Sequence, residues 1–197
     1  MPMPTLSVIR HSMAQANEQG ILMGAKFDSP LSLKGIEIAK AKGEYFKKNG
    51  FKPDRIFTSK LTRAKQTAEI ILNELGIATE IVELEDLNER DFGQYDGKPY
   101  NFVLDAFAAH GENPPTIETI EHFVSRVMKA FEYIKQETIG TTLAVTHSNP
   151  EMVMQTAVFR PGNIQRFWEL GDPAYCEGFD FSLPFKNDDH DKDAPHL

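Results

Sequence analysis

The sequence predicts an α/β fold: a three-layer sandwich in which a mostly parallel central sheet carries helices on both faces. Short β-rich runs alternate along the chain with stretches whose apolar residues recur at helical spacing, which is typical of parallel strands joined by helices. Two of these runs end in a histidine, at His11 and at His147. Because ligands of open α/β sheets bind beyond the carboxyl ends of the strands, both histidines are candidates for a functional site.

The first half of the chain contains two β-α units followed by a further strand. Residues 5–9 are β-rich, so we expect a core strand that delivers Arg10 and His11 at its carboxyl end. Ser32 suits the N-cap of the helix that follows. The expected elements are, in order, a strand at residues 5–9, a helix from 33 to about 49, a strand at 55–58, a helix at 61–75 and a strand at 78–84.

The second half begins with residues 86–100, whose charged, glycine and aromatic residues indicate a functional loop. A long amphipathic helix follows, and a second core strand then delivers His147. The expected elements are a helix at 117–134, a strand at 142–146, a helix at 151–159 and strands at 164–170 and 178–183. We expect residues 1–185 to form a single domain and residues 186–197 to form a loose, polar and acidic tail.

Composition excludes several classes of partner. The formal net charge of −8 disfavours nucleic acid and anionic lipid, because both would be repelled at long range. No apolar stretch is long enough for a membrane span, and the first residues lack the features of a signal peptide. The single cysteine, Cys176, cannot form an internal disulfide, which fits a reducing compartment. We therefore expect a cytoplasmic protein that binds neither nucleic acid nor membranes.

Arg10 and His11 have the chemistry of a phosphoryl-transfer pair. An imidazole can attack phosphorus, and a guanidinium is permanently charged and matches two phosphate oxygens. Arg63 lies in the first turn of the expected helix at 61–75, where backbone N–H groups also favour an anion. Taken alone, each feature also fits a purely structural role. Arg10 and His11 would then be an ordinary pair at the end of a strand, and Arg63 would be a solvated arginine on the surface of a helix.

Five segments, taken in order, match the motifs of one enzyme family. They are Arg10-His11, residues 28–35 (Asp-Ser-Pro-Leu-Ser-Leu-Lys-Gly), residues 58–68 (Thr-Ser-Lys-Leu-Thr-Arg-Ala-Lys-Gln-Thr-Ala), residues 87–93 (Leu-Asn-Glu-Arg-Asp-Phe-Gly) and residues 145–147 (Val-Thr-His). In these segments the chain resembles the histidine phosphatase superfamily, which includes cofactor-dependent phosphoglycerate mutases and fructose-2,6-bisphosphatases. The resemblance runs from residue 6 to about residue 153 and implies a phosphoglycerate mutase-like sandwich.

The resemblance implies a site that needs neither a metal nor a cofactor. It assigns His11 as nucleophile, Glu89 as proton donor and His147 as second catalytic histidine, and it assigns phosphate binding to Arg10, Asn17, Arg63 and Ser148. Fixed cations stabilise the charge that spreads over the phosphoryl oxygens, a task that Arg10, Arg63 and a protonated His147 would share. Arg63 is accordingly expected to stabilise charge rather than the fold.

Several residues depart from the family pattern. Ser12 and Ser148 each replace the glycine that follows a catalytic histidine, and their Cβ atoms would cost free energy if these positions required a positive φ. Met13 stands where the family has glutamate, and Ala16, rather than tryptophan, precedes Asn17. These changes affect the geometry of phosphate binding more than the mechanism.

The fate of the phosphohistidine separates two activities: water gives a phosphatase, and a second hydroxyl of a bound sugar acid gives a mutase. Glu89-Arg90 and Ser148-Asn149 resemble the mutase pattern. The segment after residue 97, however, is short and lacks the Trp-Arg-Arg and Pro-Pro block of mutases, so we favour a phosphatase. A non-catalytic module that binds phosphorylated ligands is the alternative of another class, motivated by the two serines.

The expected partner is a small phosphorylated metabolite, selected by the loops at residues 12–27 and 95–115. His110 and His122 are expected at the surface or partly packed. The tail contains the stretch Asp-Asp-His-Asp at residues 188–191, which we expect to be solvated rather than to bind a metal.

Overall fold

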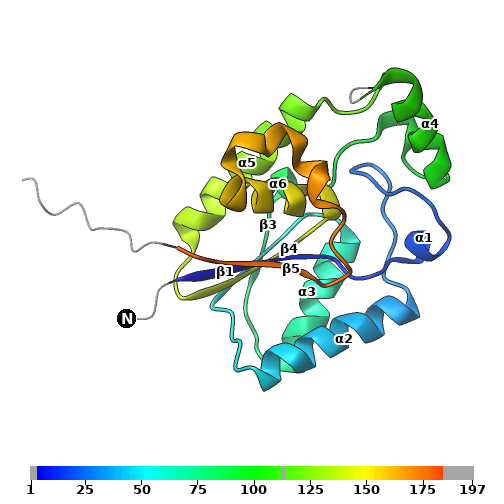
Figure 1. The fold of residues 1–197 in the computed structure, drawn as a ribbon. Helices are drawn as coiled ribbons and strands as arrows, with labels where there is room; N and C mark the ends of the chain where they lie inside the picture. The colour runs from blue at the N-terminus through cyan, green and yellow to red at the C-terminus, as the bar shows by residue number, and fades with distance from the viewer. Residues whose placement is uncertain (1–3, 112–113, 184–197) are drawn as a thin grey trace, which may run out of the picture.

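A five-stranded sheet lies at the centre of the computed structural model, which describes residues 4–111 and 114–183 (Figure 1). Its strands are β1 (Thr5–Arg10), β2 (Arg55–Thr58), β3 (Ile81–Glu83), β4 (Thr141–Thr146) and β5 (Gly178–Ser182), in the spatial order β3-β2-β4-β1-β5. The first four strands pair in parallel, and β5 pairs antiparallel with β1. The mostly parallel sheet is therefore confirmed. The predicted tail at 186–197 lies outside the described residues.

Helices cover both faces of the sheet, which confirms the three-layer sandwich (Figure 1). On one face lie α2 (Leu33–Lys48) and α3 (Thr62–Leu75), and on the other lie α5 (Ile120–Glu137) and α6 (Ser148–Phe159). Strand side chains alternate between these layers: Leu6 and Val8 join the core under α5 and α6, whereas Ile9 joins the core over α2 and α3. Because successive side chains of β1 point to opposite faces of the sheet, this strand contributes residues to both hydrophobic cores.

The helix ends follow from local chemistry. The Ser32 hydroxyl accepts a hydrogen bond from the backbone N–H of Gly35 at 3.1 Å, so α2 begins directly after this cap. Gly76 ends α3 in the left-handed conformation, with φ at 69°, which costs glycine no steric energy. The Thr119 side chain caps α5, so this helix begins at Ile120 rather than at residue 117.

One predicted strand is wrong: residues 164–170 belong to the 3-10 helical segment η3 (Pro161–Leu170). Pro161 suits the first position of a helix and has no N–H for a sheet. The free edge of β1 is already occupied by β5. Phe167 packs into the core instead, and its ring centroid lies 5.6 Å from that of Phe123.

The predicted loop at 86–100 contains local helical turns and leads into an unexpected helix. The turns are η1 (Glu85–Leu87) and η2 (Gly93–Tyr95), and the helix is α4 (Tyr100–His110). Val103 and Ala106 of α4 are buried, but Phe102 and Leu104 are exposed, so apolar residues lie all around this helix. It consequently lacks the apolar stripe by which the other helices are recognised.

The carboxyl ends of β1 and β4 meet at one edge of the sheet. The two strands pair directly, with Arg10 opposite Thr146, so His11 and His147 leave the sheet side by side. In Figure 1 these strand ends point toward the side of the molecule that carries α1 (Gln15–Glu18) and α4. Helix α6 begins at Ser148, three residues earlier than predicted, which places Ser148 in its first turn.

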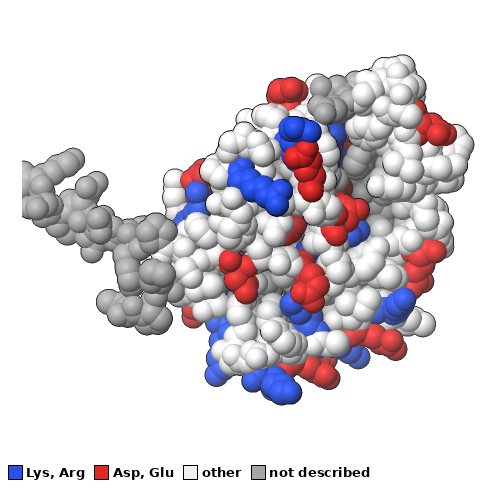
Figure 2. Space-filling model, in the orientation of Figure 1, with Lys and Arg blue, Asp and Glu red and all other residues white. Residues whose placement is uncertain are grey.

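On the face shown in Figure 2, basic and acidic side chains interleave, so this face has no single sign of charge.

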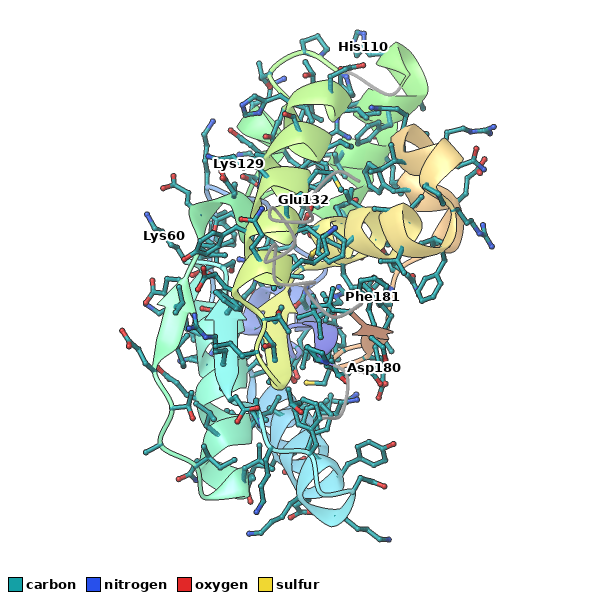
Figure 3. All side chains as sticks on the ribbon, turned by 90° about the vertical axis from the view of Figure 1, so that its left-hand side faces the viewer. Lys60, His110, Lys129, Glu132, Asp180 and Phe181 are labelled. Carbon is teal, nitrogen blue, oxygen red and sulfur yellow. The ribbon has the colours of Figure 1, made fainter. Side chains whose placement is uncertain are left out.

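His110 lies at the outer end of α4, and Lys60 lies toward the opposite edge of the sheet from Asp180 and Phe181 of β5 (Figure 3). His110 and His122 are exposed. Within residues 4–111 and 114–183, every helix is too short or too polar to cross a bilayer.

Candidate active site

A cavity of about 90 Å³ opens at the carboxyl edge of the sheet. Its lining comprises Arg10, His11, Asn17, Ile21, Leu22, Met23, Glu89, Phe92, Tyr100, Ser148, Asn149 and Asp172. The cavity thus brings together most of the site residues predicted from the sequence. The remaining two, Arg63 and His147, are buried beside His11.

His11 has the hydrogen bonding of a nucleophilic imidazole. Its backbone N–H donates to the carbonyl oxygen of Thr146 at 2.8 Å, which fixes the residue against β4. Nδ1 lies 2.6 Å from the carbonyl oxygen of Ser12, which can only accept, so Nδ1 carries the ring proton and Nε2 carries the lone pair. Burial and the charges of Arg63 and Arg10 lower the pKa of His11 well below its usual value. The ring is therefore neutral near pH 7.

His147 stands edge-on to His11, with 5.0 Å between the ring centroids. Its Nε2 atom lies 2.7 Å from the hydroxyl oxygen of Ser59. Burial, followed by the charge of Arg63, lowers the pKa of His147 well below its usual value. Burial and the neighbouring arginines thus favour the neutral ring in this arrangement, and a proton on His147 with phosphate bound stays a prediction.

The guanidinium of Arg63 is held rigidly, and its side chain has no exposed surface. One terminal nitrogen lies 2.8 Å from Asp28 Oδ1, the other donates to the carbonyl oxygen of Gly24 at 3.1 Å, and Nε–H points at His11 Nε2 over 3.3 Å. Although burial opposes the charged form of Asp28, the backbone N–H of Thr62 and the Arg63 cation lower the pKa of this carboxyl. These contacts add a structural role to the charge stabilisation expected of Arg63, and how its contribution divides between fold and catalysis stays a prediction.

Arg10 lines the cavity from the end of β1. One terminal nitrogen donates to the carbonyl oxygen of Pro173 at 2.8 Å, and the guanidinium carbon lies 4.4 Å from the ring centroid of Tyr175. Its Nε is buried and makes no hydrogen bond to any part of the chain that the structure describes. The segment before β5 thus orients this cation toward the cavity.

Glu89 is buried at the cavity wall and interacts with Asn149 of α6. Glu89 Oε1 accepts from the Asn149 amide at 3.0 Å and from the backbone N–H of Arg90 at 2.8 Å. Burial raises the pKa of Glu89 in spite of these donors. A carboxyl with a raised pKa keeps its proton closer to neutral pH, which is what a general acid requires.

Asn17 and Ser148 both reach the cavity. Asn17 Oδ1 accepts from the backbone N–H of Ala14 at 3.0 Å, which leaves the amide nitrogen of its side chain as the donor end. The Ser148 hydroxyl donates to Asp172. Ser148 therefore holds Asp172 at the cavity rim.

Neither serine that replaces a family glycine is strained. Thr116 and Cys176 are the non-glycine residues with positive φ in the described chain, so Ser12 and Ser148 adopt ordinary backbone conformations. The Ser12 hydroxyl donates to the carbonyl oxygen of Gly35 at 2.6 Å and so ties the residue after His11 to α2. The geometric objection to serine at these positions is removed.

Sequence reasoning missed several residues that support the site. Asp28, Ser59 and Asn149 lie inside or beside recognised motifs, so a signal for them existed. Asp172 and Tyr175 come from the irregular segment between η3 and β5, which carries no pattern. Over residues 4–111 and 114–183, no three histidine, cysteine or acidic side chains cluster closely enough to hold a metal ion.

Glu151 is a buried carboxyl in α6 that the site does not explain. Its exposed fraction is 1%, and neither carboxyl oxygen makes a hydrogen bond within the described chain. Burial raises its pKa to about 7, against the charge of Arg10, which lowers it. The folded protein therefore binds this proton more tightly than the unfolded chain does, and folding stability falls as the pH rises from about 4.5 to 7.

Replacing this carboxyl with a neutral isostere, Glu151→Gln, should raise the free energy of unfolding at pH 8 by about 3 kcal/mol relative to the native chain, because the raised pKa corresponds to about 1.4 kcal/mol per pKa unit. At pH 4.5 the two proteins should differ little, since the native carboxyl is then protonated. Urea unfolding at both pH values measures the difference. A variant that is less stable at pH 8 would show instead that an ionised Glu151 is stabilised by Arg10.

Comparison with known proteins relates this chain to a family. The family model described as histidine phosphatase superfamily (branch 1) matches residues 6–174. The chain is 34% identical over 147 residues to the fructose-2,6-bisphosphatase TIGAR of Mus musculus, a match that covers 71% of this chain and 54% of that protein. It is 35% identical over 144 residues to the 2,3-bisphosphoglycerate-dependent phosphoglycerate mutase of Parvibaculum lavamentivorans, over 66% of this chain and 67% of that protein.

A solved structure has the same fold. The crystal structure of phosphoglycerate mutase from Bacillus anthracis matches with a TM-score of 0.75 at 20% identity, over 91% of this chain and 87% of that one. The match to TIGAR relatives, in contrast, spans about half of their length.

Proposed function

Since the chain belongs to branch 1 of the histidine phosphatase superfamily, we propose that it hydrolyses a phosphomonoester through a phosphohistidine on His11, without a metal or a cofactor. The observation that carries the proposal is the hydrogen bonding of His11 at the cavity, where Nδ1 lies 2.6 Å from the carbonyl oxygen of Ser12 and Nε2 lies 3.3 Å from Nε of Arg63. An imidazole in this tautomer is a nucleophile at neutral pH. Glu89, Arg10, Asn17 and Ser148 line the cavity into which the substrate phosphate would fit.

In the first step, His11 Nε2 attacks phosphorus, and the bond between phosphorus and the ester oxygen breaks. Glu89 gives its proton to the leaving alkoxide, so the alcohol departs neutral and Glu89 becomes a carboxylate. Charge on the phosphoryl oxygens is stabilised by Arg10 and by Arg63, which has no freedom to move away. A bound phosphate dianion also favours a proton on His147, opposing the shift that burial causes.

In the second step, a water molecule attacks the phosphohistidine. Glu89, now a carboxylate, takes a proton from this water, and the bond between phosphorus and Nε2 breaks. His11 returns to its neutral form, Glu89 is protonated again and inorganic phosphate leaves. The two steps together convert one phosphomonoester and one water into an alcohol and phosphate.

The mutase is the second candidate, supported by the relative from Parvibaculum lavamentivorans and by the Glu89–Asn149 contact at the cavity. A mutase would pass the phosphoryl group to a second hydroxyl of a bound sugar acid. Interconversion of 2- and 3-phosphoglycerate in the presence of 2,3-bisphosphoglycerate distinguishes it from hydrolysis. A module that binds phosphorylated ligands without turning them over is the alternative of another class.

Turnover of p-nitrophenyl phosphate, with and without a chelator, tests the proposed function. We expect release of p-nitrophenolate at an unchanged rate in the presence of EDTA, because the fixed cations are arginines. Loss of activity in EDTA that zinc or magnesium restores would contradict a metal-independent mechanism. No turnover across a panel of alkyl, aryl, sugar and nucleotide phosphates would favour the binding module.

Arg63→Ala should lower kcat/KM by at least about a hundredfold, the scale of losing one preorganised electrostatic contact. It should also lower the free energy of unfolding by about 3 kcal/mol, because Asp28 loses its buried partner. Asp28→Asn is the matched variant: it breaks the same ion pair but keeps the cation. If Asp28→Asn lowers kcat/KM as much as Arg63→Ala does, Arg63 acts through the fold alone.

A further inference from the structure

A second cavity, of about 620 Å³, adjoins the catalytic cavity. Five residues line both cavities: Leu22, Phe92, Tyr100, Asn149 and Asp172. The volume is in the range of pockets that bind small molecules. A ligand whose phosphoryl group lies at His11 can therefore extend past this shared wall into the second cavity.

The second cavity lies between α4 and η3, on the side where Figure 2 shows the surface hollowed beside α4. Its lining is largely apolar and aromatic, with Val103, Leu104 and Phe107 from α4 and Phe167 and Trp168 from η3. Helix α4 encloses this space because it carries apolar residues on several sides, only some of which it buries against the rest of the chain. Transfer of an apolar group from water to such a wall is favourable.

The charges at this cavity do not suit a second anionic group. Arg90 is the cation in its described lining, and Asp172 is the carboxylate. Arg90 Nε donates to the carbonyl oxygen of Glu118 at 2.8 Å, and its guanidinium lies 5.7 Å from the ring centroid of Phe107. A second phosphate would thus meet one engaged cation and the negative charge of Asp172, whereas a hydrocarbon group would meet mostly apolar side chains.

We propose that this second cavity binds the organic part of the substrate, and that the preferred substrates are phosphate monoesters of apolar alcohols. The inference rests on the proposed phosphatase function, because it places the phosphoryl group at His11. It assigns specificity to α4 and η3, neither of which the sequence pattern predicted. Leu104, on the α4 wall, is the residue best suited to a test because it is 53% exposed and tolerates a polar side chain.

The test compares kcat/KM for hexyl phosphate and ethyl phosphate, whose leaving alcohols have similar acidity. Each methylene removed from water should raise kcat/KM by about three- to fourfold, so we expect at least about a tenfold preference for hexyl phosphate. Leu104→Asn should lower the ratio of the two values at least about fivefold. Leu33→Asn is the control, because Leu33 is 84% exposed at the start of α2, away from both cavities, and should leave the ratio unchanged.

Binding of hexylphosphonate separates this inference from the proposed function, because its P–C bond cannot be hydrolysed. Trp168 is the single tryptophan of the chain and lines the second cavity, so its fluorescence reports occupancy without catalysis. Hexylphosphonate should change this emission at a concentration at least about tenfold lower than ethylphosphonate does. Turnover with no preference for hexyl phosphate, or a preference for sugar bisphosphates or phosphoglycerate, overturns the inference and leaves the phosphatase intact. Phosphonate binding without turnover of any ester overturns the phosphatase instead.

Discussion

His11→Ala is expected to lower kcat/KM for p-nitrophenyl phosphate by on the order of 10⁴-fold or more, because the phosphoryl group then has no nucleophile to accept it. His122→Ala is the matched control. His122 is exposed and contacts Glu118 rather than the cavity, so its loss should change the rate little. Circular dichroism of both variants checks that each retains the fold.

The same residue should carry the covalent intermediate. Rapid quenching during turnover should trap a phosphate that is stable in alkali and labile in acid, and peptide mapping should place it on His11. His147 is the competing site, since its ring centroid lies only 5.0 Å away. Label on His147 or on a serine would contradict the assignment, as would full activity in His11→Ala.

The sequence predicted the fold correctly wherever the spacing of apolar residues was regular. Side chains of β1 alternate between the two faces of the sheet, and the apolar residues of α3 lie on one buried face, as their spacing predicts. Ser32 and Gly76 lie at the helix ends where their local preferences place them. The failures lie where tertiary context decides. Residues 164–170 have strand-like composition, but β1 is already paired with β5, and α4 has apolar residues on several sides, so neither segment shows its structure in its pattern.

The sequence predicted which residues gather at the site better than it predicted how they are arranged there. Topology alone places His11 beside His147, because β1 and β4 are adjacent parallel strands. The motif at residues 28–35 marked Asp28 as notable, but it did not indicate that Asp28 and the carbonyl oxygen of Gly24 would enclose Arg63, because that contact depends on how the loop folds back onto α3. Nor did the sequence indicate that burial would keep His147 neutral, because burial is a property of the assembled core.

Glu89 is the proposed proton donor, and its contacts differ from those of the two acidic residues near it in the sequence. Glu89 lines the cavity at His11, whereas the neighbouring acids Asp86 and Asp91 are not part of its lining. Asp91 pairs with Lys26 at 2.7 Å, and Asp86 pairs with Lys129 at 3.1 Å. Glu89 is the one of the three at the cavity, and burial raises the pKa of its carboxyl.

Leaving-group chemistry tests this assignment. An alkyl phosphate leaves as a strongly basic alkoxide and needs a proton, while p-nitrophenolate leaves without one. Glu89→Gln should therefore lower kcat/KM for hexyl phosphate between about ten- and a thousandfold more than for p-nitrophenyl phosphate, the usual scale of general acid catalysis. In the native enzyme, alkyl phosphate turnover should also decline as the pH rises through the raised pKa of Glu89, because the acid is then lost. Asp91→Asn is the matched control and should affect both substrates alike. Equal losses on both substrates in Glu89→Gln, or a selective loss in Asp91→Asn, would remove Glu89 from the role of proton donor.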